Sequence, residues 1–303
     1  MSRLSLLVCA LVLLLQHSWG DKPKTPPSLP YPDFFILGAQ KCATTVLNKM
    51  IMMHSAFCKT GVKEKHYFTD GTWVTKEKTD EYLAEFQDCG KGEITVDATP
   101  SYIAEDNVAG RIKSAYPPEV LAKKKFLVIF REPAARHYSQ YQRDVRRCLS
   151  LASERGSHKG YARKAEPLCQ HVLREPPKTG EVIGFLQQLS MSREELQGEL
   201  RTFAEWTASE FGQKAMRRGF YLQQINNFLD VVDRSQLFIL NFDSLIRNTT
   251  QVVLAMSEFL GVDGQEFFRV SGNNVTWING TVQPQIHSNF SATSIRLPPE
   301  PPT

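Results

Sequence analysis

The chain has 303 residues, of which 42% are hydrophobic and 22% are charged. A chain of this size and composition folds as an ordinary globular protein with one sizeable core or two small ones. The formal net charge of +4 is too small for polyanions to be bound through overall charge. Any affinity for them has to come from a local basic patch.

The N-terminal residues 1–20 differ in character from the rest. Arg3 precedes the apolar run Leu4–Leu15, and polar and small residues follow it up to Gly20. The run is shorter than the roughly 20 apolar residues that span a bilayer. This layout is typical of a secretory signal peptide cleaved near Gly20, with a short uncleaved signal anchor as the alternative.

Two further features favour the secretory pathway, either the Golgi lumen or secretion. Acceptor tripeptides for N-glycosylation begin at Asn248, Asn274, Asn279 and Asn289. Five of the six cysteines lie beyond the leader, where an oxidising lumen permits them to pair. No other stretch is apolar enough to span a membrane, so we expect membrane contact only through an N-terminal anchor.

The odd number of remaining cysteines leaves at least one thiol free, and the sequence alone does not fix the connectivity. We expect the pairs Cys58–Cys89 and Cys148–Cys169, with Cys42 free. No pair has the C-x-x-C spacing of metal ligands, so we predict no metal site.

Short apolar runs alternate with helical periods along the chain. The pattern predicts strands at Phe34–Leu37, Glu93–Asp97, Phe126–Phe130 and Leu237–Leu240. It predicts helices at Thr44–Met53, 134–147, 181–190, 193–210, 219–231 and Thr250–Leu260. This alternation indicates an α/β fold with a mostly parallel sheet that helices cover on both faces.

The composition also divides the chain. Residues 21–33 are proline-rich and are predicted to be a tether between the leader and a domain at 34–270. Residues 271–303 form a polar C-terminal tail with three of the acceptor asparagines, and we expect it to be loosely ordered.

The segment GAQKCATT, Gly38–Thr45, follows the first predicted strand and leads into a helix. Backbone N–H groups and the dipole at a helix start favour an anion, and Lys41, Thr44 and Thr45 add a charge and hydroxyl donors. A Walker loop would place its lysine directly after a second glycine, which this segment lacks. An ordinary strand–turn–helix with a solvated lysine is the alternative.

A second segment, FLVIFREPAARHYSQYQRDVRR, carries Arg131 at the end of a strand and Ser139 on the following helix. A guanidinium and a hydroxyl so placed can converge on one phosphate. The alternative is that Arg131 pairs with a carboxylate such as Glu132.

Together the two segments resemble the sulfotransferases that use 3′-phosphoadenosine 5′-phosphosulfate (PAPS). That family has a K-x-[GA]-T-T loop at the 5′-phosphosulfate and R-x-P-x-x-R-x-x-S-x-Y at the 3′-phosphate, matched here from Lys41 and from Arg131. The resemblance implies a P-loop-like parallel sheet flanked by helices, with PAPS as co-substrate and no metal. The residues it places at the nucleotide are Gly38, Lys41, Cys42, Ala43, Thr44, Thr45, Arg131 and Ser139.

Further segments resemble the Golgi glycosaminoglycan branch, including heparan sulfate O-sulfotransferases and N-acetylgalactosamine 4-sulfate 6-O-sulfotransferase. KEKHYF is similar to its E-x-H-F-F segment, which implies Glu64 as catalytic base with His66 beside it and Lys41 as a further catalytic group. DATPSY is similar to its K-T-P-x-Y segment, and residues 217–262 resemble its closing helices and strand. The acceptor implied is a sulfated or unsulfated glycosaminoglycan.

The sequence departs from this pattern in three places. Ala43 replaces the commoner glycine, Ala98 replaces the lysine before T-P, and the family's later K-G-F and K-G-R segments have no counterpart after Gly261. An inactive, secreted glycan-binding protein on the same fold is therefore the second hypothesis, and a nucleotide kinase is the third.

A basic stretch follows the second segment. It suits docking of a sulfated polysaccharide as well as it suits a solvated face, and we expect no nucleic acid in this compartment. Its members are Arg143, Arg146, Arg147, Arg155, Lys159, Arg163, Lys164, Arg174 and Lys178.

Overall fold

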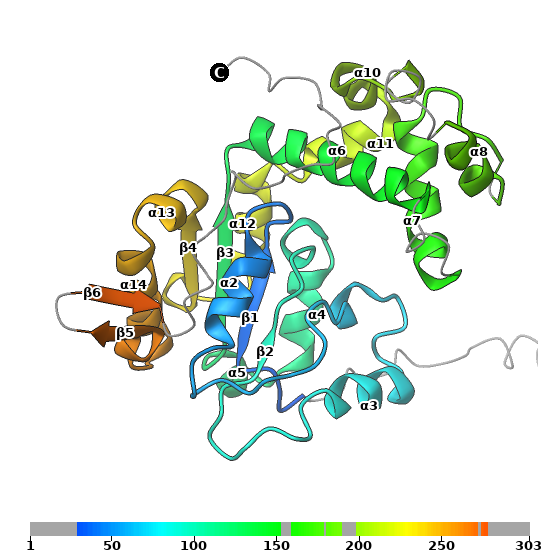
Figure 1. Ribbon diagram of the computed structural model, residues 1–303. Helices are drawn as coiled ribbons and strands as arrows, with labels where there is room; N and C mark the ends of the chain where they lie inside the picture. The colour runs from blue at the N-terminus through cyan, green and yellow to red at the C-terminus, as the bar shows by residue number, and fades with distance from the viewer. Residues whose placement is uncertain (1–28, 153–158, 179, 190–197, 272–273, 278–303) are drawn as a thin grey trace, which may run out of the picture.

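A four-stranded parallel sheet forms the centre of the computed structural model, which describes residues 29–152, 159–178, 180–189, 198–271 and 274–277 (Figure 1). The strand order is β2–β1–β3–β4, and each neighbouring pair is parallel. The strands are β1 Phe34–Gly38, β2 Val96–Asp97, β3 Lys125–Phe130 and β4 Leu237–Asn241. The predicted α/β fold is confirmed.

The central strands are apolar throughout because helices cover both faces of the sheet. All five residues of β1 are buried, and so are the four central residues of β3. The register places Phe35 of β1 opposite Phe126 of β3, and their rings stack with centroids 5.2 Å apart. This pair fixes the alignment of the two strands that carry the predicted site segments.

Adjacent β3 side chains show which helices cover which face. Lys125 lies over the ring of Phe259 on α14 (Thr249–Leu260), whereas Phe126 contacts Phe228 on α12 (Tyr221–Leu229). Neighbouring residues of a strand point to opposite faces, so α14 and α12 cover opposite sides of the sheet.

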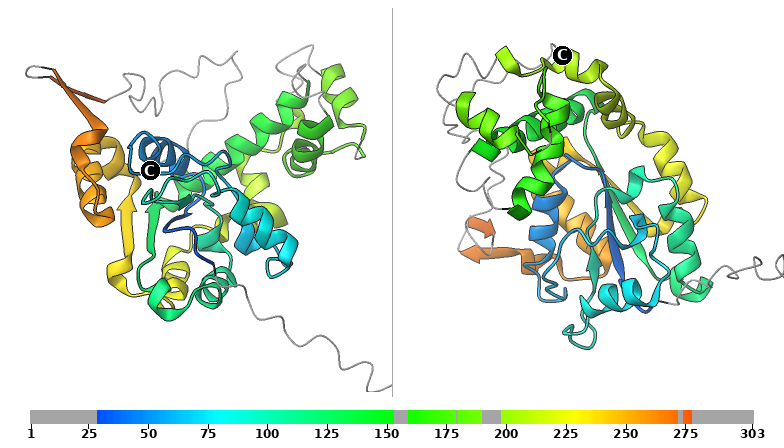
Figure 2. Two further views of the ribbon diagram at one scale, coloured as in Figure 1. Left: turned by 90° about the horizontal axis from the view of Figure 1, so that it is seen from below. Right: turned by 90° about the vertical axis from the view of Figure 1, so that its right-hand side faces the viewer.

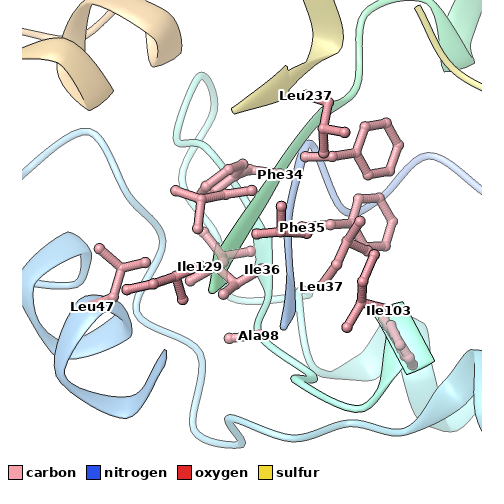
Figure 3. Close-up of a cluster of buried hydrophobic side chains, with 14 of the residues drawn as sticks. Phe34, Phe35, Ile36, Leu37, Leu47, Ala98, Ile103, Ile129 and Leu237 are labelled. Atoms are coloured by element: carbon pink, nitrogen blue, oxygen red, sulfur yellow. The ribbon is translucent and has the colours of Figure 1, made fainter. Parts of the chain in front are cut away.

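The same alternation organises the core around β1 (Figure 3). Ile36 and Ile129 point toward Leu47 of α2 (Thr44–Ile51), while Phe35 and Leu37 point to the opposite side. A close approach there requires Gly38, because a Cβ on it would lie 2.4 Å from the side chain of Ile103.

The connections leave β1 and β3 in different directions. From β1 the chain passes through α2 and α3 (Lys76–Ala84) to β2 at one edge. From β2 it passes through α4 (Val108–Ala115) and α5 (Pro118–Leu121) and crosses β1 to reach β3. From β3 the chain continues to β4 at the opposite edge of the sheet. The carboxyl ends of β1 and β3 therefore form a topological switch point, where ligands bind in open α/β sheets.

A helical lobe follows β3 and has its own hydrophobic cluster, centred on Trp206 (Figure 1). Its described helices are α6 Pro133–Leu149, α7 Lys159–Val172, α8 Val182–Leu189, α10 Phe203–Ala208 and α11 Glu210–Arg217. The disulfide Cys148–Cys169 joins α6 to α7, and Cys58–Cys89 closes the segment before β2. Cys42 is free, so the expected pairing is confirmed. Two disulfides are typical of extracellular or lumenal proteins.

The predicted single helix over 193–210 is wrong within the described residues. Leu200 forms an antiparallel bridge with Leu173, and Thr202 then starts α10 with a capping box to Glu205. Ser209 caps α11 in turn. The sequence contains these capping residues, but apolar residues at helical spacing continue past them, so the pattern predicted one uninterrupted helix.

Other boundaries differ less. Helix α2 ends at Ile51, before the predicted Met53, and β2 holds only the last two residues of the predicted strand Glu93–Asp97. Helices α3, α4, α5, α7, α11 and α13 (Phe242–Arg247) were not predicted.

The ends of the domain extend beyond the predicted limits. Leu29, within the predicted tether, is buried and donates its backbone N–H to Ala115. In the predicted loose tail, Asn274–Trp277 form β6, which pairs with β5 (Phe268–Ser271) in a hairpin on the side of the sheet away from the helical lobe (Figure 2). Residues 1–28, which include the predicted leader, and 278–303 lie outside the described residues. Within the described part, no helix is both long and apolar enough to cross a bilayer.

Candidate active site

A polar cleft of about 440 Å³ opens at the carboxyl ends of the strands. Segments that follow all four strands contribute to it, together with α6. Seven of the ten predicted site residues line it, and three do not. The lining residues are Gln40, Lys41, Ala43, Thr44, Thr45, Glu64, Pro100, Arg131, Ser139, Arg143, Arg147 and Phe242.

The loop after β1 presents its backbone to this cleft. Lys41 and Ala43 both adopt left-handed conformations, with φ of 71° and 66°. Ala43 is the residue before α2 and gives the helix no side-chain cap. The first N–H groups of α2 therefore have no side-chain acceptor, as is expected where an external anion fills that role. Glycine adopts such a left-handed φ freely, whereas a residue with a Cβ rarely does.

Lys41 is partly buried among other cations. Burial lowers the pKa of its ammonium group to about 8, and Arg143 and Arg146 add to the lowering by repulsion, while Asp144 opposes it. An anion bound in the cleft would reverse this shift, because it stabilises the charged form of the lysine.

Arg131 lies at the end of β3, with its guanidinium 4.7 Å from the ring centroid of Phe242. The alternative that Glu132 pairs with it does not hold. The Glu132 carboxylate instead caps α6, accepting from the N–H groups of Ala134 and Ala135 at 2.8 and 2.5 Å. Arg131 and Ser139 thus line the same cleft with the arginine charge directed to it rather than to Glu132.

Glu64 reaches the cleft from the segment before β2. Its Oε1 accepts from Lys63 Nζ at 2.8 Å, and its Oε2 lies 3.7 Å from His66 Nε2. The His66 side chain, followed by Lys63, lowers the pKa of Glu64 to about 2 against the opposing effect of burial. The carboxylate is therefore ionised throughout the physiological range. His66 itself lines an adjacent hollow rather than the cleft.

A buried network holds the backbone directly after Glu64. Asp97 is fully buried and accepts hydrogen bonds from Thr99, Tyr82 and Tyr102 at 2.6, 2.9 and 2.9 Å. Thr99 Oγ1 in turn accepts from the N–H of Lys65 at 3.1 Å. This network carries the segment that bears Glu64 and needs no side chain from Ala98, which is buried in the core.

Three predicted residues do not line the cleft. Gly38 packs against Pro100 and Ile103, so its role here is close packing. Cys42 points inward, where its thiol lies 4.0 Å from the hydroxyl of Tyr221 and burial raises its pKa. His66 stands beside Glu64, as described above.

Five lining residues were not among the predicted site residues: Gln40, Pro100, Phe242, Arg143 and Arg147. Arg143 and Arg147 follow Ser139 at four-residue intervals, so helical spacing could have placed them on its face. Arg143 is partly neutralised by the buried Asp144, 2.7 Å away. Of the other members of the basic stretch, Arg174 pairs with Glu205, and Arg155 lies outside the described residues.

The cleft is therefore suited to a ligand with more than one negative group. Lys41 and the N–H groups of α2 come from the segment after β1, whereas Arg131 and Ser139 come from the end of β3 and from α6. Glu64 is a carboxylate on its wall that can accept a proton. This donor set fits a nucleotide with separated 5′ and 3′ anionic groups, because each set of donors can serve one of them.

Comparison with known proteins agrees with this assignment. Residues 31–271 match the model of the sulfotransferase domain, and the chain belongs to that family. Among solved structures, a sulfotransferase from Alicyclobacillus acidocaldarius aligns at 22% identity with a TM-score of 0.51, covering 80% of this chain and 88% of its own. The sulfotransferase domain of the curacin biosynthetic pathway aligns at 17% identity and a TM-score of 0.41, covering 78% of this chain and 75% of its own. No curated protein matches the chain.

Membership of the family implies sulfuryl transfer from PAPS, and it leaves the kinase hypothesis without support. The structural similarity supports the fold alone. The acceptor is not identified by either comparison.

The lowered pKa of Lys41 leads to a prediction about proton uptake on ligand binding. With a pKa of about 8, Lys41 is about half neutral at pH 8, and a bound polyanion raises that pKa. Binding of adenosine 3′,5′-bisphosphate at pH 8 should therefore take up about half a proton, and affinity should fall as the pH rises further. Calorimetry in two buffers of different ionisation enthalpy measures the uptake.

The matched control is Lys41→Arg, which keeps the charge but does not titrate in this range. It should bind the bisphosphate without proton uptake. Equal uptake by both proteins would show that Lys41 does not contact the anion.

Proposed function

We propose that the protein is a carbohydrate O-sulfotransferase of the secretory pathway, which transfers a sulfuryl group from PAPS to a hydroxyl of a glycosaminoglycan. The single observation that carries the proposal is the cleft that joins the Lys41 loop, Arg131 and Ser139 to Glu64. The leader and the acceptor asparagines support the compartment, and the disulfides are consistent with it.

Different residues would bind different groups of PAPS during the transfer. Lys41, Thr44 and Thr45, with the first N–H groups of α2, would hold the 5′-phosphosulfate, and Arg131 and Ser139 would hold the 3′-phosphate. PAPS supplies the activated sulfuryl group. Lys41 would also offset the charge that develops on the departing phosphate oxygen, because a preformed cation costs no reorganisation during the reaction.

Glu64 would accept the proton of the acceptor hydroxyl. Its contacts with Lys63 and His66 keep it ionised, but they also make it a weaker base than an ordinary carboxylate. We assign His66 the task of orienting this carboxylate, since its Nε2 faces Glu64 from outside the cleft. No metal is needed for these steps, because lysine, arginine and N–H groups neutralise the charge.

The acceptor is proposed from the charge around the cleft. Arg143 and Arg147 line it beside Ser139, and Glu64 is the single carboxylate among its lining residues. Such a wall favours an anionic chain over a neutral small molecule. The second hypothesis, an inactive glycan-binding protein, is favoured by Ala98, which brings no charge to the site.

Sulfate transfer from radiolabelled PAPS to chondroitin, dermatan, heparan and keratan chains tests the proposal. We expect incorporation into at least one of them. Binding of these chains without incorporation into any would favour the inactive glycan-binding protein instead.

The variant Glu64→Gln separates the two hypotheses at one residue. It keeps the size of the side chain but removes the proton acceptor, so turnover should fall by about 10²–10⁴-fold. Affinity for adenosine 3′,5′-bisphosphate, measured by calorimetry, should be nearly unchanged.

The control is Glu77→Gln, an exposed position on α3, which should keep wild-type turnover. Wild-type rates in Glu64→Gln would remove Glu64 as the base. A parallel loss of nucleotide affinity would point to a structural role.

A further inference from the structure

A second hollow lies next to the cleft and has no role in the mechanism above. Its volume is about 360 Å³, and it lies between the segment after β2 and the turn that joins α11 to α12. The two sites adjoin, because Arg218 at this hollow donates to the side chain of Gln40, which lines the cleft. The lining residues are Ala104, Glu105, Asp106, Lys214, Arg217, Arg218, Phe220, Gln223 and Gln224.

The hollow contains a buried polar group that lacks a partner. Gln224 is 8% exposed, and its Nε2 donates to the backbone oxygen of Arg217 at 3.2 Å. Among the described residues, none donates a hydrogen bond to its Oε1. This oxygen has less than 1 Å² of accessible surface, so Gln224 forms part of the wall of the hollow and its Oε1 is not open to a ligand.

An apolar side chain stands at the same place. Phe220 is 55% exposed, although aromatic side chains of this size are usually covered. The turn Arg218–Phe220 between the two helices sets this ring beside the arginines, and Gln223 adds a second amide. An exposed ring with amides around it suits a sugar, whose ring has apolar C–H faces and hydroxyl edges.

Charges of both signs line the hollow. Glu105 and Asp106 are exposed carboxylates that can accept hydrogen bonds from sugar hydroxyls, and Arg217 can bind an anionic group. Lys214 is occupied by Glu210 at 2.7 Å, whereas no carboxylate of the described residues forms an ion pair with Arg217. Arg217 is exposed at the end of α11. Arginine binds carboxylate and sulfate groups in a bidentate manner.

We propose that this hollow is a second carbohydrate subsite, which binds a carboxylate- or sulfate-bearing sugar next to the sugar that is sulfated. The inference rests on the proposed carbohydrate acceptor. Arg217 binds the anionic group, Phe220 packs on the ring, and Glu105 and Asp106 accept from hydroxyls. The enzyme would thus select a hydroxyl by the charge of the neighbouring sugar in the chain.

The test measures steady-state sulfate transfer with the full chain, using whichever chain of the panel accepts sulfate. Arg217→Ala should raise the KM for that chain about tenfold, the value of one charge-assisted contact, and leave the KM for PAPS unchanged. Arg217→Lys should recover part of the loss, because it keeps the charge. Lys123→Ala, an exposed cation at the amino end of β3, is the control and should match the wild type.

Modified chains identify the anionic group. If the group is a carboxylate, carboxyl reduction of the chain should raise the wild-type KM about tenfold and have no further effect on Arg217→Ala. If it is a sulfate, desulfation should do so instead. Phe220→Ala should raise the KM for native and modified chains alike.

The outcomes separate this inference from the proposed function. Transfer to a chain, with unchanged KM in both Arg217→Ala and Phe220→Ala, would overturn the subsite alone. Additive effects of Arg217→Ala with both carboxyl reduction and desulfation would also overturn it. Binding of adenosine 3′,5′-bisphosphate without transfer to any carbohydrate would overturn the proposed acceptor, and the subsite with it.

Discussion

Parallel pairing of β1 with β3 is the constraint on which the site depends. The stacked rings of Phe35 and Phe126 lie in this pairing, and it brings the ends of two strands that are distant in sequence to the same edge of the sheet. One end carries the Lys41 loop and the other carries Arg131. Because helices leave the two strands in different directions, the space between them stays open for a ligand. A core substitution that shifted this register would therefore separate the two groups of anion donors without touching either of them.

The sequence predicted the parts of this arrangement that depend on local pattern. Apolar runs located all four strands, and the loop after β1 and the Arg131 segment were recognised from residue types and spacing. The sequence analysis did not predict that new helices begin after Thr202 and Ser209. Hydrophobic periodicity does not detect a capping residue when apolar residues continue at helical spacing on both sides of it. The sequence also did not predict that Gly38 and Cys42 face inward, since their orientation is set by contacts with Ile103 and Tyr221, which come from other segments.

The positive charges in the cleft favour a bound anion, and they destabilise the folded state when no anion is bound. Lys41, Arg143 and Arg147 line one cleft, and repulsion among them contributes to the depressed pKa of Lys41. Like charges held close together destabilise the folded state unless a counter-charge is present. Asp144 supplies part of it to Arg143, and a bound nucleotide would supply the rest. Arg143 and Arg147 of α6 also bring positive charge to the site.

The most direct test of the account is whether the cleft distinguishes the 3′-phosphate. Calorimetry should compare adenosine 3′,5′-bisphosphate with adenosine 5′-phosphate on the wild type and on Arg131→Ala. The account predicts that the wild type binds the bisphosphate at least about tenfold more tightly, as one charge-assisted contact allows, and that Arg131→Ala loses this preference. Equal affinity of the wild type for the two nucleotides, or a preference that survives in Arg131→Ala, would contradict it.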